Sequence, residues 1–280
     1  MHIHAALHEA KKALKASNNS GEEKLEAQLL LEHVLKVNHA WLISHADDEI
    51  DAKANATLNA LVKRRMTGEP IAHILGKREF YGLPFKVTPD TLIPRPDTET
   101  LVESALAKIP NNETCHILDL GTGTGAIALA IAKHKPLSQV AAVDASEKAL
   151  KVAVENAVNL GINNITFTLS NWFYALQDQN FDVIVSNPPY IESDDPHLSK
   201  GDLRFEPHSA LASGKDGLDD IRQIIQQAPD HLNTNGWLML EHGYNQASAV
   251  AVLLKAANFI DIAHATDLAG IERVTLGRIA

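Results

Sequence analysis

The chain of 280 residues has a single cysteine, few aromatic residues and no run rich in lysine or arginine. One cysteine, Cys115, excludes an intrachain disulfide and any metal site built from paired cysteines, and it suits a reducing compartment. The formal net charge is −10, whereas sequence-independent binding to phosphates needs a basic surface. A nucleic-acid substrate is therefore disfavoured, and only a local basic patch would reopen it.

Long apolar segments are also missing. No stretch reaches the roughly 18 apolar residues of a membrane-spanning helix, and no charged and apolar leader opens the sequence. These absences predict a cytoplasmic protein without a membrane segment. The 14 histidines are scattered, and although His4 and His8 have the spacing for one helix face, solvated helix residues explain them better. We predict no metal site.

Residues 1–76 show helical periodicity and no strand-like alternation. Apolar residues recur at helical spacing in two early segments: Ile3, Leu7, Ala10 and Leu14, then Leu25, Leu29, Val34 and Leu35. Ser20 and Glu23 match a capping box, and Pro70 and Gly76 bracket a short helix over 71–75. The pattern predicts a small helical bundle with a role in docking a partner or simply in packing.

Residues 77–97 change period. Apolar and aromatic residues on both sides of Gly82-Leu83-Pro84 predict a short hairpin over 79–87. Two prolines then stiffen the segment 93–97. This segment is either a linker or the roof of a ligand pocket that places Arg95 near a carboxylate.

From residue 98 onward, predicted strands and helices alternate as in a doubly wound α/β sheet. Strand 116–120 leads through Gly121-Thr122-Gly123-Thr124-Gly125 into a helix of small residues, so backbone N–H groups can approach a ligand at the helix start. Strand 139–143 ends at Asp144, at a suitable distance to bind ribose hydroxyls. The same spacing suits a nicotinamide or flavin enzyme, so the cofactor stays open at this point.

The tetrapeptide Asn187-Pro188-Pro189-Tyr190 ends the apolar strand 181–186. Two prolines fix two φ angles and remove two backbone donors, so the strand must stop and a rigid loop must follow. The Asn187 amide oxygen and a proline carbonyl can accept the two hydrogens of a planar NH₂ group, and the Tyr190 ring can cover its face. Together with the glycine-rich turn, this loop predicts methyl transfer from S-adenosylmethionine to an NH₂ group.

The remaining segments complete the domain 98–280. Helix 146–160 is predicted to end at Gly161, and strands are expected at 165–169, 237–240, 259–264 and 272–276. The polar stretch 192–216 lacks periodicity and is either an active-site loop or a solvated insertion.

Three other functions fit part of the pattern. An adenine amino-methyltransferase acting on nucleic acid would use the same tetrapeptide, but it would need lysines and arginines for phosphates. A regulatory binding protein would keep the glycine-rich turn but has no need for Asn187. A dehydrogenase has no evident use for the tetrapeptide.

Several motifs together resemble one known family, the glutamine methyltransferases that modify peptide chain release factors. The resemblance covers most of the chain, and its motifs are 93–99, 117–129, 185–191, 204–207, 240–243 and 272–278. It implies a seven-stranded α/β methyltransferase sheet with an antiparallel last strand, preceded by the helical domain. The implied substrate is the glutamine of a Gly-Gly-Gln loop on a release factor.

The resemblance also implies site roles. Gly121 to Gly125 and Asp144 would contact S-adenosylmethionine, Trp172 would lie beside its adenine, and Asn187 to Tyr190 would hold the substrate amide. Asn171 departs from the acidic residue expected at its position, but its side-chain oxygen can still accept a hydrogen bond from the adenine amino group. That bond would lack charge assistance, so weaker cofactor affinity is an open expectation.

Overall fold

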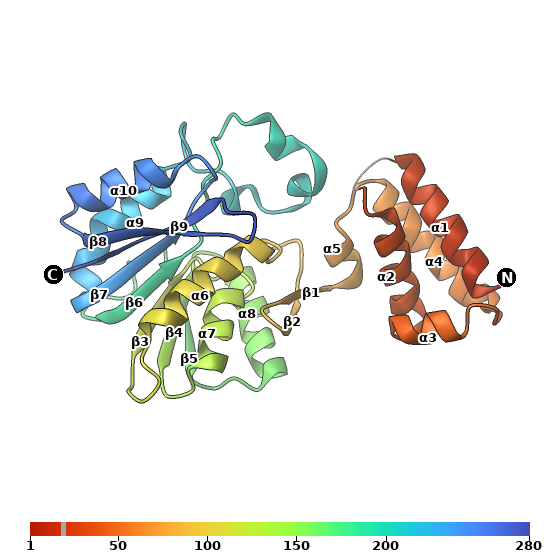
Figure 1. Ribbon diagram of the computed structural model, residues 1–280, viewed down its shortest axis with the longest axis horizontal. Helices are drawn as coiled ribbons and strands as arrows, with labels where there is room; N and C mark the ends of the chain where they lie inside the picture. Colours follow the sequence, from red (N-terminus) through yellow and green to blue (C-terminus); the bar gives the residue numbers. More distant parts are fainter. Residues whose placement is uncertain (18–20) are drawn as a thin grey trace. The chain divides into compact units, whose positions relative to one another are not determined.

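The computed structural model describes residues 1–17 and 21–280, so Ser20 of the expected capping box lies outside the described residues. The chain divides into two compact units (Figure 1). The first comprises Met1–Gly76 together with Ser199–Phe205, and the second comprises Lys77–Leu198 with Glu206–Ala280.

The first unit is built from helices. They are α1 (Ile3–Ser17), α2 (Glu23–Leu35), α3 (His39–Ser44), α4 (Ala52–Met66) and α5 (Ile71–Leu75). Side chains of Asn38 and Asp51 cap α3 and α4 by accepting backbone N–H bonds at 2.9 and 2.7 Å. Ile3, Ala10 and Leu14, which have the expected apolar spacing in α1, are buried in the core. In α2 the buried core residues are instead Ala27, Leu30 and Leu31. Leu25 has the expected helical spacing but lies exposed.

An ion pair is buried in this helical unit. Arg65 on α4 donates from Nε to Oε1 of Glu26 on α2 at 2.9 Å, and both side chains are buried. Arg65 also pairs with Asp202, and Arg204 donates to the carbonyl of Thr67 at 2.6 Å. Through these contacts, the short segment Ser199–Phe205 belongs to the helical unit although it lies far away in sequence.

A two-stranded antiparallel hairpin opens the second unit. Strand β1 (Lys77–Phe80) pairs with β2 (Leu83–Lys86) around a two-residue turn, Tyr81-Gly82. Leu83 and Pro84, expected in the turn, therefore lie in β2. The Asn156 side chain, on helix α8 (Glu147–Leu160), accepts from the N–H of Lys86 at 2.7 Å and donates to the Thr124 carbonyl at 2.9 Å. This amide thereby links the hairpin to the glycine-rich turn.

The second unit contains a seven-stranded sheet, which confirms the predicted α/β fold. Its strand order is β5-β4-β3-β6-β7-β9-β8, and only β9 runs antiparallel to its neighbours. The strands are β3 (His116–Leu120), β4 (Gln139–Asp144), β5 (Ile165–Leu169), β6 (Phe181–Ser186), β7 (Leu232–Glu241), β8 (Ile260–Thr266) and β9 (Glu272–Arg278). The last three extend beyond the runs expected from sequence.

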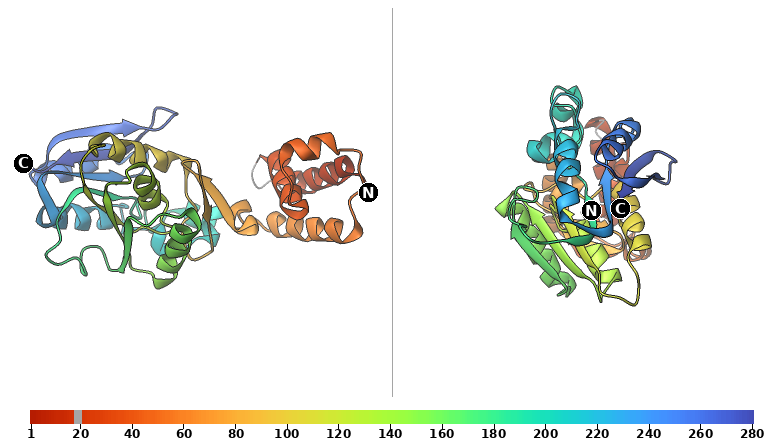
Figure 2. Two further views of the ribbon diagram at one scale, coloured as in Figure 1. Left: turned by 90° about the horizontal axis from the view of Figure 1, so that it is seen from below. Right: turned by 90° about the vertical axis from the view of Figure 1, so that its left-hand side faces the viewer.

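Helices cover both faces of the sheet (Figure 2). Apolar residues of α6 (Glu99–Lys108) and α7 (Ala126–His134) join one core with the hairpin, and α8 packs beside them. Helices α9 (Asp219–Gln227) and α10 (Ala247–Ala256) join the core on the other face. Helix α8 ends at a left-handed Gly161 as expected, and the Ser146 side chain caps its start by accepting the N–H of Ala149.

The polar stretch 192–216 is not a structureless loop. It holds three short 3₁₀ helices, Pro196–Ser199, Gly201–Phe205 and His208–Ala210. Helix α9 follows it and was not anticipated from sequence. Among the described residues, no helix is both long enough and apolar enough to span a membrane.

Candidate active site

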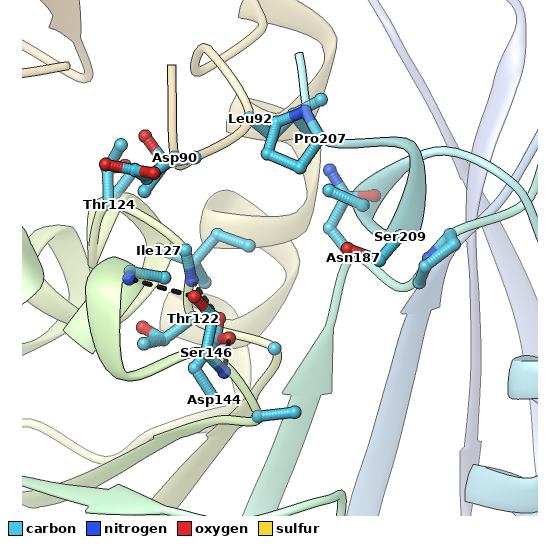
Figure 3. Close-up of a pocket in the computed structure, with 18 of the residues that line it drawn as sticks. Asp90, Leu92, Thr122, Thr124, Ile127, Asp144, Ser146, Asn187, Pro207 and Ser209 are labelled. Carbon is cyan, nitrogen blue, oxygen red and sulfur yellow. Dashed lines mark hydrogen bonds between the residues drawn. The ribbon is translucent and has the colours of Figure 1, made fainter. Parts of the chain in front are cut away.

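A cleft of about 380 Å³ opens at the carboxyl ends of the parallel strands, beside the point where the strand order reverses between β3 and β6. Ligands of doubly wound sheets bind at such switch points, because the loops on either side diverge there. Residues from several loops line the cleft, among them Gly121, Thr122, Gly123, Thr124, Asp144, Asn171, Trp172, Asn187 and Pro189. The structure therefore brings most of the predicted site residues together (Figure 3).

The glycine-rich turn forms one wall of this cleft. The backbone N–H groups of Gly121 and Thr122 both donate to the carbonyl of Val143 at 2.9 Å, which holds the turn against β4. Gly121 has a φ of 73°, and a Cβ there would meet the Trp172 ring at 3.4 Å. Glycine at this position lets the turn adopt a left-handed conformation beneath the indole.

Gly125, the last glycine of the turn, does not line the cleft. A Cβ built on it would approach the Cβ of Ala153 on α8 to 3.2 Å and Cδ1 of Leu129 to 3.0 Å. This glycine is therefore explained by close helix packing, combined with its φ of 82°. Its predicted contact with a cofactor stays a prediction.

Asp144 lies at the end of β4 and binds backbone N–H groups of the glycine-rich turn and of the segment that follows β4. Its Oδ2 accepts the N–H of Gly123 and its Oδ1 accepts the N–H of Ser146, both at 2.8 Å (Figure 3). Burial raises the pKa of this carboxyl, while the backbone hydrogen bonds work in the opposite direction. A carboxylate has about four lone-pair sites, so Asp144 retains acceptor capacity for a ligand.

Asp119, which sequence analysis treated only as part of a strand, is buried directly behind the turn. Thr122 donates from its hydroxyl to Oδ2 of Asp119 at 2.6 Å. The pKa of Asp119 is raised to about 7, chiefly by burial, and the nearby Asp144 acts in the same direction. Its place in the apolar strand β3 gave no sign of this role, because the hydroxyl partner lies in the following turn.

Asn187 presents an unpartnered acceptor at the end of β6. Its Nδ2 donates to the hydroxyl oxygen of Thr98 at 3.2 Å, whereas its Oδ1 is buried and has no partner among the described residues. Buried polar atoms are nearly always hydrogen-bonded, and one left without a partner suggests a missing ligand. In Figure 3, Asn187 lies beside Ser209 and away from the Asp144 cluster.

Tyr190 does not line the cleft, unlike Asn187 and Pro189. Its hydroxyl donates to Oε1 of Glu241 at 3.3 Å, its N–H donates to Leu211, and its carbonyl accepts from Gln246 at 3.0 Å. Burial, and the nearby Glu241 carboxyl, raise the pKa of Tyr190. These contacts anchor the loop from behind, so the ring does not have the pocket-facing position expected from sequence. Pro188 is also buried and away from the cleft.

The segment 93–97 contributes to the cleft. Of the two interpretations that the sequence left open, a linker or the roof of a ligand pocket, this favours the roof. Leu92, Pro94 and Arg95 line the cleft. The carboxylate beside Arg95 is that of Glu206, which also accepts the N–H of Ile93 at 2.8 Å. Glu206 thus ties the polar stretch to this roof, a role that sequence spacing could not reveal.

Trp172 and Asn171 line the cleft after β5. Trp172 has a φ of 47°, an unusual conformation for a large residue, and the Ser170 hydroxyl donates to its carbonyl at 2.7 Å. This bond fixes the backbone at Trp172, and the indole lies against Gly121 of the glycine-rich turn. Among the described residues, no cluster of three or more His, Cys, Asp or Glu could hold a metal ion.

Both parts of the chain match known protein families. Residues 5–76 match the family described as the PrmC N-terminal domain, and residues 111–268 match the methyltransferase domain family. The chain is 48% identical over 266 residues to a release factor glutamine methyltransferase of Xylella fastidiosa, covering 95% of this chain and 97% of that protein. A protein of the same name from Vibrio cholerae is 49% identical over 277 residues, which are 99% of this chain and 96% of the relative.

Among solved structures, a methyltransferase from Pyrococcus furiosus aligns with a TM-score of 0.53 at 17% identity. The alignment covers 77% of this chain and 96% of that one. At this identity the likeness shows the shared fold alone.

Proposed function

Because the chain belongs to the release factor glutamine methyltransferase family, we propose that it methylates the glutamine of the Gly-Gly-Gln loop in peptide chain release factors. The methyl group comes from S-adenosylmethionine and goes to the side-chain amide nitrogen. The observation that carries this proposal is the buried Oδ1 of Asn187, an acceptor without a partner at the cleft. A primary amide supplies the donor that this oxygen lacks.

The cleft has the groups that S-adenosylmethionine requires. The turn from Gly121 to Thr124, three of whose N–H groups are bonded to Val143 and Asp144, would border its amino-acid part, and Asp144 would accept hydrogen bonds from the ribose hydroxyls. Trp172 would lie beside the adenine, with Asn171 accepting from the adenine amino group. When bound, the cofactor supplies an electrophilic methyl group on a positively charged sulfur.

The residues around Asn187 address the weak nucleophilicity of an amide. The amide nitrogen shares its lone pair with the adjacent carbonyl, and this delocalisation must be reduced before the nitrogen can attack. Oδ1 of Asn187 and a proline carbonyl would accept the two amide hydrogens and fix the nitrogen in place. Fixed geometry converts an encounter into an effectively unimolecular step. The nitrogen would take the methyl group as the sulfur–methyl bond of the cofactor breaks and leaves neutral S-adenosylhomocysteine. It would then release one proton to solvent, so that no base has to act beforehand.

The proposed substrate is a folded protein, and the proposed location is the cytoplasm, where release factors act. The helical unit is proposed to contact the substrate beyond the cleft. The negative charge of the chain disfavours a direct nucleic-acid substrate. An isolated loop peptide would lose such remote contacts and would also have to become ordered, so it should be a much poorer substrate.

The test measures methyl incorporation from labelled S-adenosylmethionine into three acceptors in parallel. These are a release factor, the same factor with its loop glutamine replaced by asparagine, and duplex DNA that contains adenine. We expect labelling of the first alone, because asparagine shortens the reach by one methylene and misaligns the nitrogen. Labelling of DNA at a comparable rate would instead favour an adenine amino-methyltransferase. Labelling of the asparagine variant would rule out the proposed acceptor.

A further inference from the structure

The turn between β8 and β9 presents a leucine to solvent. Leu268 is fully exposed, and the hairpin that carries it protrudes from the sheet (Figure 2). A single exposed apolar side chain is common on protein surfaces. Here two more large apolar side chains belong to the same region, Ile271 at 37% exposure and Tyr244 at 73%. Apolar side chains that gather on an exposed surface mark a site of interaction.

Strand pairing brings Tyr244 to this turn. The pairing of β7 with β9 continues past the end of β7, where the N–H of His242 donates to the carbonyl of Arg273 at 2.9 Å. Because the two strands are antiparallel, the residues that follow His242 lie beside those that precede Arg273. Tyr244 and Ile271 therefore emerge at the same place, and Leu268 lies in the turn that precedes Ile271. We call these three residues the apolar tip.

Asp267 holds the turn of the apolar tip in shape. Its Oδ1 accepts the N–H groups of Ala269 and Ile271 at 2.9 and 3.0 Å. Its Oδ2 accepts Nε of Arg273 at 2.9 Å, and its own N–H donates to the Ile271 carbonyl at 2.9 Å. A turn that is ordered before binding loses little conformational entropy on binding. Leu268 is thus presented on a preorganised support.

The apolar tip lies on the same side of the sheet as the cleft. Its turn joins β8 to β9 beyond the point where β7 ends, and the cleft opens at the carboxyl ends of the parallel strands. Arg273, which bonds Asp267 in the turn, also pairs with Asp97 at 3.0 Å. Asp97 belongs to the roof segment 93–97. One guanidinium therefore connects the turn to the roof of the cleft and pairs with both carboxylates.

We propose that the apolar tip is a docking surface for an apolar patch on the folded protein that carries the acceptor glutamine. The tip would contact that protein outside the cleft while the glutamine enters it. This inference rests on the proposed function, because it assigns a second point of contact to the same substrate. A second copy of this chain is a poorer occupant, since a stable dimer buries about 800 Å² on each partner, more than three side chains supply.

Three substitutions test the contact. Leu268→Asp places a charge in the apolar tip, and Leu268→Met keeps an apolar side chain there. Leu137→Asp is the matched control, because Leu137 is also an exposed leucine, at 57%, but it precedes β4 and so lies at the opposite edge of the sheet. Substitutions at such exposed positions change stability little, so each variant should remain folded.

With a release factor as substrate, Leu268→Asp should raise KM by about tenfold or more, because an apolar contact is lost and a charge must be desolvated. The kcat and the Kd for S-adenosylhomocysteine should not change, since the cleft is intact. Leu268→Met and Leu137→Asp should match wild type. With a short peptide that contains only the Gly-Gly-Gln loop, Leu268→Asp should also match wild type, because the peptide lacks the docking patch.

Three kinetic results would overturn the inference while leaving the proposed function intact. They are an unchanged KM in Leu268→Asp, an equal rise of KM in Leu137→Asp, and an equal loss of activity on the peptide. A wild-type protein that methylates no release factor would instead reject the proposed function, and this inference with it.

A second readout reports the contact without turnover. Cys115 is the only cysteine of the chain and is buried, and burial raises its pKa to about 12, so a maleimide at pH 7 modifies an introduced exposed cysteine selectively. In Leu268→Cys, the rate of modification, followed by mass spectrometry, should fall severalfold when release factor and S-adenosylhomocysteine are added. It should stay constant in Leu137→Cys. An unprotected cysteine at position 268, at a release factor concentration that saturates methylation, would refute the docking surface.

Discussion

Removal of the Asp144 carboxylate tests the proposed cofactor site most directly. Both carboxyl oxygens accept backbone N–H groups at 2.8 Å and hold the turn around Gly123 and the start of α8. In the proposed complex they accept two ribose hydroxyls as well. We therefore expect Asp144→Ala to weaken binding of S-adenosylhomocysteine, both by removing an acceptor and by loosening the turn.

The magnitude follows from the two lost bonds. A hydrogen bond to a charged group contributes about 1.5–3 kcal/mol net, so two such bonds contribute at least about 3 kcal/mol. That loss corresponds to a Kd higher by about a hundredfold or more. Asp144→Asn keeps one acceptor without its charge, and its Kd should rise by about tenfold because neutral hydrogen bonds are roughly half as strong.

Isothermal titration calorimetry measures these Kd values, and urea denaturation verifies that each variant is folded. Asp182→Ala is a matched control, because this carboxylate also accepts a backbone N–H, that of His116 at 2.8 Å, but at the other end of the parallel strands. Its Kd should stay within about twofold of wild type, as distant sites act independently. A folded Asp144→Ala that binds within about threefold of wild type, or an equal loss in Asp182→Ala, would refute the assignment.

Three further predictions concern catalysis and stability. Asn187→Ala should lower kcat by about tenfold to a hundredfold and leave the Kd for S-adenosylhomocysteine unchanged, as measured by steady-state kinetics and calorimetry. A raised Kd with an unchanged kcat would mean that Asn187 binds mainly the cofactor. Burial raises the pKa values of Asp119 and Glu241 to about 7, so the folded state holds protons that the unfolded state has released. The free energy of unfolding without ligand should therefore fall as pH rises from about 4 to 7. In urea titrations, Asp119→Asn and Glu241→Gln should each show a smaller fall than wild type over this range; a fall equal to that of wild type would disprove the raised pKa values. Glu26→Ala leaves Arg65 buried without its main partner and should destabilise the helical unit by about 3 kcal/mol in chemical denaturation. Glu9→Ala, which changes an exposed residue of α1, should have almost no effect, and equal stabilities of the two variants would contradict this expectation.

Local patterns predicted much of the fold because they depend on neighbours in the chain. The alternation of apolar strands with helices and the glycine that ends α8 reflect short-range geometry. The hairpin was also predicted, although its turn is Tyr81-Gly82 and not Gly82-Leu83-Pro84. Errors arose where burial depended on distant partners. Leu25 has the spacing of a core residue, yet it lies on the exposed side of α2 because the other helices of the bundle pack against residues such as Leu30 and Leu31.

The candidate site was predictable to the same extent. Glycine, aspartate and the Asn-Pro-Pro-Tyr run are adjacent in sequence to the strands that they follow, so their convergence at one edge follows from the parallel sheet. Tyr190 lies outside the cleft lining because its hydroxyl and carbonyl bond to Glu241 and Gln246, which come from another strand end and the turn after it. Its role at the substrate amide stays a prediction. Period and spacing contain no information about such cross-strand hydrogen bonds.

The sequence by itself determined the α/β class, the helical N-terminal region and the chemical character of the cleft, since residue type and local spacing suffice for each. Only the tertiary structure decided which polar atoms of the site are satisfied and which remain available. Thr98 and Asn187 lie far apart in the chain, as do Tyr190 and Glu241, and each pair meets only because α6, β6 and β7 converge at one sheet edge. Hydrogen bonds extend over about 3 Å, so partners at this distance are specified by the packing of the elements and not by their order along the chain.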